Sequence, residues 1–255
     1  MNTTRPRPGV SGVASADRVL TVLTAFRIGD AALSLAELAH RTGLIKSTIM
    51  RLVVSLEKYG LVTRLADGNY ILASEVVRLN AVYQDSHDVG RHIMPRLYQL
   101  TEESGETASF YVRHGAYRLC QYRVNSPHRL RIHLQPGDMR PMDKAAGAQA
   151  LQTPYEVAKA GITPYYSCGA TDPHASSVAL PIYDAQQELL GALVISGPAN
   201  RLSLERAESL YEVLREAADE LTRSLGGKPL YGTDPTKSKR RKGQEAAPGT
   251  PDEQA

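Results

Sequence analysis

Cysteine is scarce in this sequence of 255 residues, and its two cysteines, Cys120 and Cys168, lie far apart. Neither belongs to a CxxC pair, and the seven histidines show no metal-ligand spacing, so we expect free thiols and no metal site. No apolar run approaches the length of a membrane span. Residues 1–12 contain arginines and prolines without a following hydrophobic core, which is not the pattern of a signal peptide. These absences favour a cytoplasmic protein without membrane association.

The motifs of common enzyme classes are also missing. The sequence has no glycine-rich phosphate loop, no G-x-S-x-G and no H-E-x-x-H. Three acids of the second half, Asp143, Asp172 and Asp184, have no base or nucleophile placed near them by a motif. An enzyme acting on a small molecule is therefore the least supported class, and we expect neither catalytic residues nor a cofactor.

The net charge of +3 is unevenly distributed along the chain. Residues 1–72 carry nine Lys and Arg against five Asp and Glu, whereas residues 73–225 carry 15 against 18. The length allows two domains with separate hydrophobic cores. An excess of positive charge on the first segment is typical of nucleic-acid binding, with a different role for the second segment. The basic run at 237–242 is expected to be a solvated tail.

Residues 34–56 read as two short helices separated by a glycine. Ser34 stands where an N-cap is needed, and Gly43 stands where a left-handed C-cap ends the first helix. The second helix begins near Lys46 and places an apolar stripe toward a core. Its other face carries short polar or cationic side chains near the positive end of the helix dipole, as a DNA recognition helix requires: Lys46, Ser47, Thr48, Met50 and Arg51. An ordinary amphipathic helical hairpin is the alternative.

The neighbouring segments favour the helix-turn-helix. A further helix is expected over residues 17–26. After the helical pair, two apolar runs at 61–65 and 69–72 flank Asp67-Gly68, and Asp-Gly in that position is a strong hairpin signal. Three helices and a hairpin make a winged helix-turn-helix, with Arg64 on the wing.

The rest of the chain indicates an α+β domain. Helical patterns cover residues 74–83, 89–104, 143–152, 154–160 and 203–225, with an early kink or a late helix start expected at Pro95. Alternating patterns predict strands over 107–113, 116–124, 130–134, 177–183 and 189–196. Residues 136–138 are expected to form a turn, and residues 167–173 are expected to form a turn, with a loop that closes over a pocket as the alternative. An antiparallel sheet flanked by helices is a sensor architecture.

Together these segments resemble the IclR family of bacterial transcription regulators. The resemblance is carried in the first half by residues 18–20, 34–39, 42–44, 46–48, 51–52 and 68–72, and in the second by 122–127, 141–147, 181–184, 191–198 and Arg201. One departure is Ile45, where the family usually has proline.

The resemblance implies an α+β fold in which an N-terminal winged helix-turn-helix domain is joined by a linker helix to a C-terminal GAF-like α+β effector-binding domain. The expected divisions are a disordered segment 1–14, the winged domain 15–73, the linker helix 74–88, the effector-binding domain 89–226 and a disordered tail 227–255.

The function implied by the resemblance is ligand-responsive transcription regulation. The expected partners are a double-stranded DNA operator and a small organic acid, aromatic acids included, with the chain acting as a homodimer or a dimer of dimers. Family members typically hold the effector carboxylate with backbone amides near a helix start and small polar side chains of later strands. The corresponding residues here are Ala146, Gly147, Ser177, Val194 and Ser196. The expected effector-binding set also includes Asp143, and Ser167 and Cys168 of the 167–173 loop.

Three of these effector positions have an alternative role. Gly147 is nearly as well explained by close packing of helix on sheet, and Ser177 and Ser196 by hydrogen bonds within the sheet. Val194 stands where the family often has a serine. A C-terminal domain that only dimerises is the second functional alternative.

Overall fold

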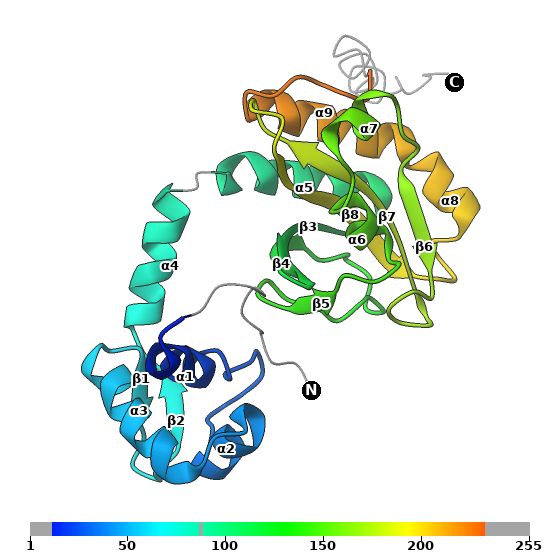
Figure 1. Ribbon diagram of the computed structural model, residues 1–255. Helices are drawn as coiled ribbons and strands as arrows, with labels where there is room; N and C mark the ends of the chain where they lie inside the picture. The colour runs from blue at the N-terminus through cyan, green and yellow to red at the C-terminus, as the bar shows by residue number, and fades with distance from the viewer. Residues whose placement is uncertain (1–11, 87–88, 233–255) are drawn as a thin grey trace, which may run out of the picture. The chain divides into compact units, whose positions relative to one another are not determined.

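The computed structural model describes residues 12–86 and 89–232. The chain divides into two compact units, residues 1–88 and 89–255 (Figure 1). Among the described residues, no helix is both long and apolar enough to cross a membrane. The same residues contain no group of three or more His, Cys, Asp or Glu side chains that could hold a metal ion.

The first unit is a winged helix-turn-helix followed by one helix. Its elements are α1 (Ala14–Leu23), α2 (Leu35–Thr42), α3 (Lys46–Lys58), the paired strands β1 (Val62–Arg64) and β2 (Tyr70–Leu72), and α4 (Glu75–Ser86). The core consists of apolar side chains from α1 to α3 and the hairpin, among them Val22, Leu38, Ile49, Val53, Leu56 and Tyr70. The predicted buried stripe of the second helix thus packs as expected.

Local interactions define both ends of α2. The Glu37 amide donates to Ser34 Oγ at 3.2 Å and the Ser34 amide donates to Glu37 Oε2 at 2.8 Å, so the two residues form a capping box. Gly43 ends α2 with a φ of 71°, which is unstrained only for glycine. Arg41 donates to both carboxylate oxygens of Asp30 at 2.6 and 2.8 Å, and these hydrogen bonds lower the pKa of Asp30.

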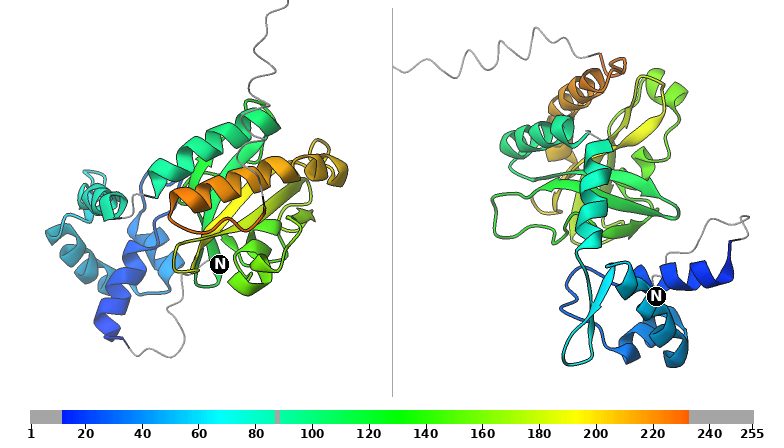
Figure 2. Two further views of the ribbon diagram at one scale, coloured as in Figure 1. Left: turned by 90° about the horizontal axis from the view of Figure 1, so that it is seen from above. Right: turned by 90° about the vertical axis from the view of Figure 1, so that its left-hand side faces the viewer.

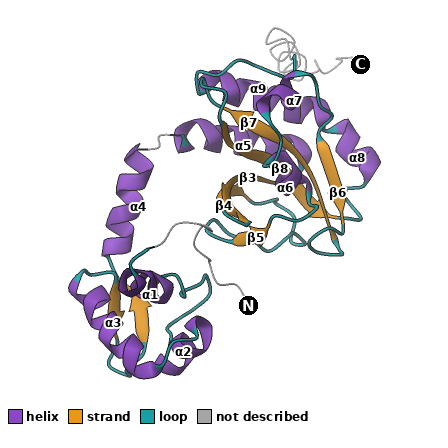
Figure 3. Ribbon diagram, in the orientation of Figure 1, coloured by secondary structure: helices purple, strands orange, loops and turns teal. Residues whose placement is uncertain are grey.

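The second unit is a six-stranded antiparallel sheet with helices on both faces (Figure 3). The strand order is β5-β4-β3-β8-β7-β6, and the strands are β3 (Thr107–His114), β4 (Tyr117–Val124), β5 (Met139–Pro141), β6 (Tyr165–Cys168), β7 (Ala175–Tyr183) and β8 (Leu189–Pro198). The helices are α5 (Gly90–Ser104), α6 (Ala146–Ala150), α7 (Tyr155–Lys159), α8 (Leu204–Ser209) and α9 (Tyr211–Ser224). This is the expected α+β class.

Alternation along the strands divides the sheet into two different faces. One face carries Phe110, Leu180 and Leu193, which pack with buried side chains of α5 and α9 in the main core. Figure 2 shows these two helices side by side over the sheet. The opposite face carries Tyr111 and Val194 and contacts the short helix α6. The small residues of α6 allow the close approach, and the pocket described below lies on this face.

Several expectations about the second unit are wrong in detail. Residues 130–134 form no strand, because the Ile132 and Leu130 carbonyls accept hydrogen bonds from the guanidinium groups of Arg123 at 2.6 Å and Arg201 at 2.9 Å instead of from a neighbouring strand. Two short edge strands, β5 and β6, were not predicted. The helix expected over 203–225 is divided at Leu210, whose φ of −95° and ψ of −4° depart from regular helix geometry.

The boundaries of the ordered regions also differ from expectation. Helix α1 begins at Ala14, inside the segment expected to be disordered, and ends at Leu23, before the predicted end. Residues 227–232, expected to belong to the tail, are instead bound to the second unit through Leu230 and Tyr231. The remainder of the expected tail, including the basic run 237–242, and residues 1–11 and 87–88 lie outside the described residues.

Candidate functional site

Helix α3 presents a continuous exposed face on the side opposite its buried stripe. Of the predicted contact residues, Lys46, Ser47, Met50 and Arg51 are exposed and Thr48 is half-buried. Helical spacing places 47, 50 and 51 together near the N-terminal end, where unpaired amides and the helix dipole favour phosphate and base-edge acceptors. Within the described part of the chain, the side chains of Ser47 and Arg51 form no hydrogen bond or ion pair. The face is therefore available to an external partner.

Arg64 lies on the wing, as predicted, but its side chain is folded over its own hairpin. The guanidinium carbon lies 5.9 Å from the centroid of the Tyr70 ring, which is within cation–π range. The Arg64 amide donates to Glu57 Oε1 of α3 at 3.2 Å, which ties the wing to the recognition helix. Gly68 at the hairpin tip has a φ of 85°, as the Asp-Gly signal requires.

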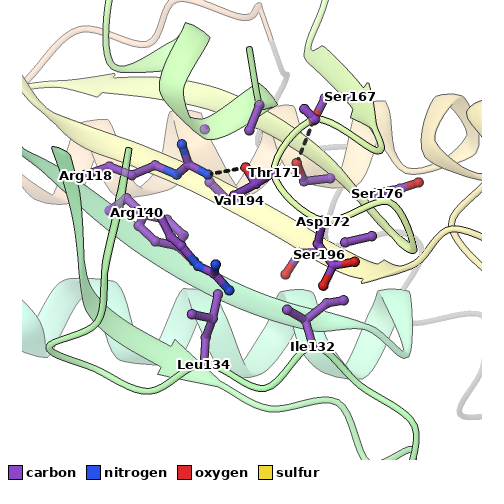
Figure 4. Close-up of a pocket in the computed structure, with 16 residues that line it drawn as sticks. Arg118, Ile132, Leu134, Arg140, Ser167, Thr171, Asp172, Ser176, Val194 and Ser196 are labelled. Carbon is purple, nitrogen blue, oxygen red and sulfur yellow. Dashed lines mark hydrogen bonds between the residues drawn. The ribbon is translucent and has the colours of Figure 1, made fainter. Parts of the chain in front are cut away.

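The second unit contains a pocket on the α6 face of the sheet (Figure 4). Its empty space is about 550 Å³, including the opening to solvent. Apolar, hydroxyl and charged side chains share the lining: Tyr111, Arg118, Ile132, Leu134, Arg140, Ala145, Gly147, Ser167, Ala170, Thr171, Asp172, Ala175, Ser176, Ser177, Val194 and Ser196. This mixture suits a small ligand with one apolar body and a few polar groups.

The sheet alternation decides which predicted effector residues reach this pocket. Ser167 of β6, Ser177 of β7, and Val194 and Ser196 of β8 all line it, and so does Gly147 of α6. Cys168 follows Ser167 directly, so its side chain points to the other side of β6, where it is exposed. Asp143 and Ala146 are not among the lining residues. The predicted set is thus brought together only in part.

The polar predicted residues differ in how far they are already hydrogen-bonded. The Ala146 amide donates to Ser167 Oγ at 2.9 Å, and Ser167 Oγ lies 3.0 Å from Ser177 Oγ. The Ala146 amide and the hydroxyls of Ser167 and Ser177 are therefore hydrogen-bonded to one another, which is the alternative role considered for Ser177. The Ser196 hydroxyl, in contrast, makes no hydrogen bond to any described residue.

Gly147 combines both roles considered for it. It lines the pocket, and a Cβ atom built on it would lie 3.2 Å from Val194 Cγ2, so Val194 would have to shift by a few tenths of an ångström. The absence of a side chain thus lets α6 pack closely on β8 and keeps the pocket open at the same point.

Asp143 does not line the pocket itself but forms an ion pair with Arg118, which does. Arg118 Nη1 lies 2.8 Å from Asp143 Oδ1, and Arg118 Nη2 donates to Thr171 Oγ1 at 3.0 Å. Thr171 Oγ1 in turn donates to Asp143 Oδ2 at 2.6 Å. Burial opposes ionisation of Asp143, but the hydrogen bonds from Thr171, the Ala145 amide and Arg118 outweigh it, so the pKa of Asp143 lies below its usual value. The triad holds the 169–174 loop at the pocket rim.

Sequence reasoning missed the two arginines that line the pocket, although the loop that contributes Asp172 was expected near a pocket. Arg118 and Arg140 are direct cross-strand partners on β4 and β5. Strand alternation places Arg118 on the same face of the sheet as Cys120, so the side on which Arg118 lies could have been predicted from the sequence. The position of Arg140 could not, because the strand that contains it was not predicted.

The fold and these two surfaces define a class: a winged-helix DNA-binding regulator with a second, pocket-bearing α+β unit. Comparison with known proteins agrees with this assignment. Residues 15–66 match the model of the IclR helix-turn-helix domain, and residues 170–223 match the model of the bacterial transcriptional regulator IclR C-terminal domain. The chain belongs to the IclR family of bacterial transcription regulators, as the residue pattern suggested.

Three similar proteins illustrate the relationship. The transcriptional repressor IclR of Escherichia coli is 25% identical over 256 residues, covering 86% of this chain and 93% of the relative. An IclR family transcriptional regulator from Brucella abortus superposes with a TM-score of 0.69 at 20% identity, covering 88% of this chain and 99% of that one. An IclR homolog from Microbacterium hydrocarbonoxydans, solved in complex with 4-hydroxybenzoate, gives a TM-score of 0.68 at 18% identity over 84% and 99% of the two chains.

Proposed function

We propose that this protein is a DNA-binding transcription regulator whose second unit senses a small organic acid. The observation that carries the proposal is the pocket on the α6 face, where apolar walls surround arginine and hydroxyl side chains. An arginine guanidinium matches the planar geometry of a carboxylate, and the apolar walls suit a compact carbon skeleton. The complex of the Microbacterium hydrocarbonoxydans homolog with 4-hydroxybenzoate is consistent with such an effector.

On the DNA side, we propose that the exposed end of α3 enters the major groove of a double-stranded operator. Lys46, Ser47, Thr48, Met50 and Arg51 would contact bases and phosphates, and Arg64 would leave Tyr70 to reach the backbone beside the wing. Effector binding in the second unit would shift the balance between DNA-binding arrangements of the first units.

The effector proposal is tested by ligand-induced stabilisation. The full chain is heated with small carboxylic acids and with the neutral amide of each. Acids that bind the folded state raise the melting temperature with concentration, since ligand binding stabilises by mass action. If no acid raises the melting temperature more than its amide does, the acid-sensing proposal fails, and a second unit that only dimerises becomes the better explanation.

Filling the pocket should separate sensing from DNA binding. We expect Gly147→Leu to abolish the response to any stabilising acid, because a side chain there lies against Val194 and extends into the pocket. Operator affinity without effector should stay within about twofold of wild type, because no residue of the first unit is changed. The measurement is operator binding during acid titration, with Gly147→Ala as the milder variant. A normally folded Gly147→Leu protein that responds like wild type would place the effector elsewhere.

Assembly is the second expectation. One winged helix covers a short half-site, too little for a unique operator, so we propose a homodimer or a dimer of dimers on DNA. Light scattering of the protein, alone and with a duplex selected from a random pool, should give a mass of at least two chains per operator. A strict monomer under both conditions contradicts the proposal.

A further inference from the structure

The two arginines of the pocket are in opposite electrostatic situations. Arg118 and Arg140 are directly opposed across β4 and β5, and like charges in that position destabilise a sheet unless they are compensated. Arg118 is compensated by Asp143, at 2.8 Å. Arg140 is half-buried, and within the described ranges its side chain has neither a hydrogen bond nor an ion pair.

The pocket also contains one carboxylate without a cationic partner. Asp172 is half-buried in the rim loop, and its Oδ1 accepts a hydrogen bond from the His174 amide at 2.9 Å. Among the described residues, no ion pair uses the Asp172 carboxylate. Figure 4 shows the Arg140 side chain extending into the pocket next to Leu134, whereas Asp172 and Ser196 lie together at a different part of the pocket wall. The space thus holds one uncompensated cation and one uncompensated anion.

We propose that Arg140 binds the carboxylate of the effector and that Asp172 accepts a hydrogen bond from a hydroxyl or ammonium group on the same molecule. The proposal rests on the function proposed above and narrows the ligand to small acids that also carry a hydrogen-bond donor. A guanidinium gives a carboxylate two parallel hydrogen bonds, and an ionised acceptor strengthens the bond from a donor. Apolar side chains such as Ile132, Leu134 and Val194 would surround the skeleton between the two polar ends.

The experiment measures dissociation constants by calorimetry on the full chain with two series of probes. One series is benzoate, 4-hydroxybenzoate, 4-(aminomethyl)benzoate and 4-hydroxybenzamide; the other is butyrate, 4-hydroxybutyrate, 4-aminobutyrate and 4-hydroxybutyramide. We expect the hydroxy or amino acid of at least one series to bind more tightly than its parent acid. The hydroxy and amino members distinguish the two kinds of donor.

Variants assign the two ends of the ligand. Arg140→Gln should weaken every binding acid by about tenfold or more, as the loss of a charged hydrogen-bond donor does, and should leave the amide unchanged. Arg140→Lys keeps the positive charge but loses the pair of parallel hydrogen bonds, so its affinity for the acids should lie between those of wild type and Arg140→Gln. Asp172→Asn should weaken the hydroxy or amino acid but not the parent acid. Arg129→Gln removes an exposed arginine that does not line the pocket and should behave as wild type.

Three other results would each contradict a specific part of the proposal. Tight acid binding that survives in folded Arg140→Gln overturns the inference while leaving an acid-sensing regulator in place. Equal binding of parent and substituted acids, unchanged by Asp172→Asn, overturns the second half of the inference. If no acid of either series binds, the proposed effector class fails together with the inference.

Discussion

Replacing Ser47 and Arg51 of α3 by alanine should remove most of the specific affinity for the operator while leaving the fold intact. Each base-contacting side chain typically contributes about 1–3 kcal/mol, so the double variant should lose on the order of a hundredfold or more if both residues read bases. Both residues are exposed, and their side chains form no hydrogen bond or ion pair with the described residues. Their removal therefore costs the folded state little.

The comparison that isolates base reading uses a second site on the same helix. Lys58 is exposed at the C-terminal end of α3, away from the positive end of the dipole. Lys58→Ala changes the charge by the same amount as Arg51→Ala, but it should leave the ratio of operator to unrelated DNA unchanged. Gel shifts at several salt concentrations measure both the ratio and the salt dependence. An unchanged ratio in the double variant would mean that the face of α3 does not read the operator.

The first unit could be predicted from sequence because its signals are local. The capping box at Ser34, the left-handed Gly43 and the Asp-Gly hairpin tip each act within a few residues of the chain. The helical spacing of apolar residues in α3 then determines which face of this helix is buried. The exposure of the predicted contact residues follows from this, since side chains of this helix that are not buried face outward.

The second unit was harder because its short elements depend on distant partners. Residues 139–141 and 165–168 become strands only because β4 and β7 lie beside them. Residues 130–134 alternate like a strand, but arginines from β4 and from the segment after β8 bind two of their carbonyls. Which polar group reaches a backbone carbonyl is decided by tertiary packing, and a pattern of period two carries no information about it.

The pocket of the second unit shows the same limit at single residues. The family resemblance pointed to the sheet face that carries the pocket through Ser177, Val194 and Ser196, because alternation preserves their direction. The expected set also included Cys168, which the same alternation directs away from the pocket. The pairing of Arg118 with Asp143 spans 25 residues and a sheet edge, so nothing local predicts which arginine remains uncompensated.

The strongest effect on stability is expected at Asp219, which anchors the residues assigned to the tail on sequence grounds. The side chain is fully buried on α9, and its Oδ1 accepts hydrogen bonds from the Leu230 amide at 2.9 Å and the Tyr231 amide at 3.0 Å. Tyr231 Oη then donates to the Pro181 carbonyl at 2.7 Å, and burial raises the pKa of this phenol. The carboxylate thus holds the segment after α9 against the edge of the main core.

Asp219→Ala leaves two partly buried amide donors without their acceptor, and each such group costs about 1–3 kcal/mol. We therefore expect the free energy of unfolding of the second unit to fall by about 2–5 kcal/mol in urea titrations followed by circular dichroism. Glu212→Ala is the matched control, because it removes an acid from the same helix whose ion pair with Arg215 is exposed and worth at most about 1 kcal/mol. Equal, small losses in both variants would show that docking of the 227–232 segment through Asp219 does not stabilise the domain.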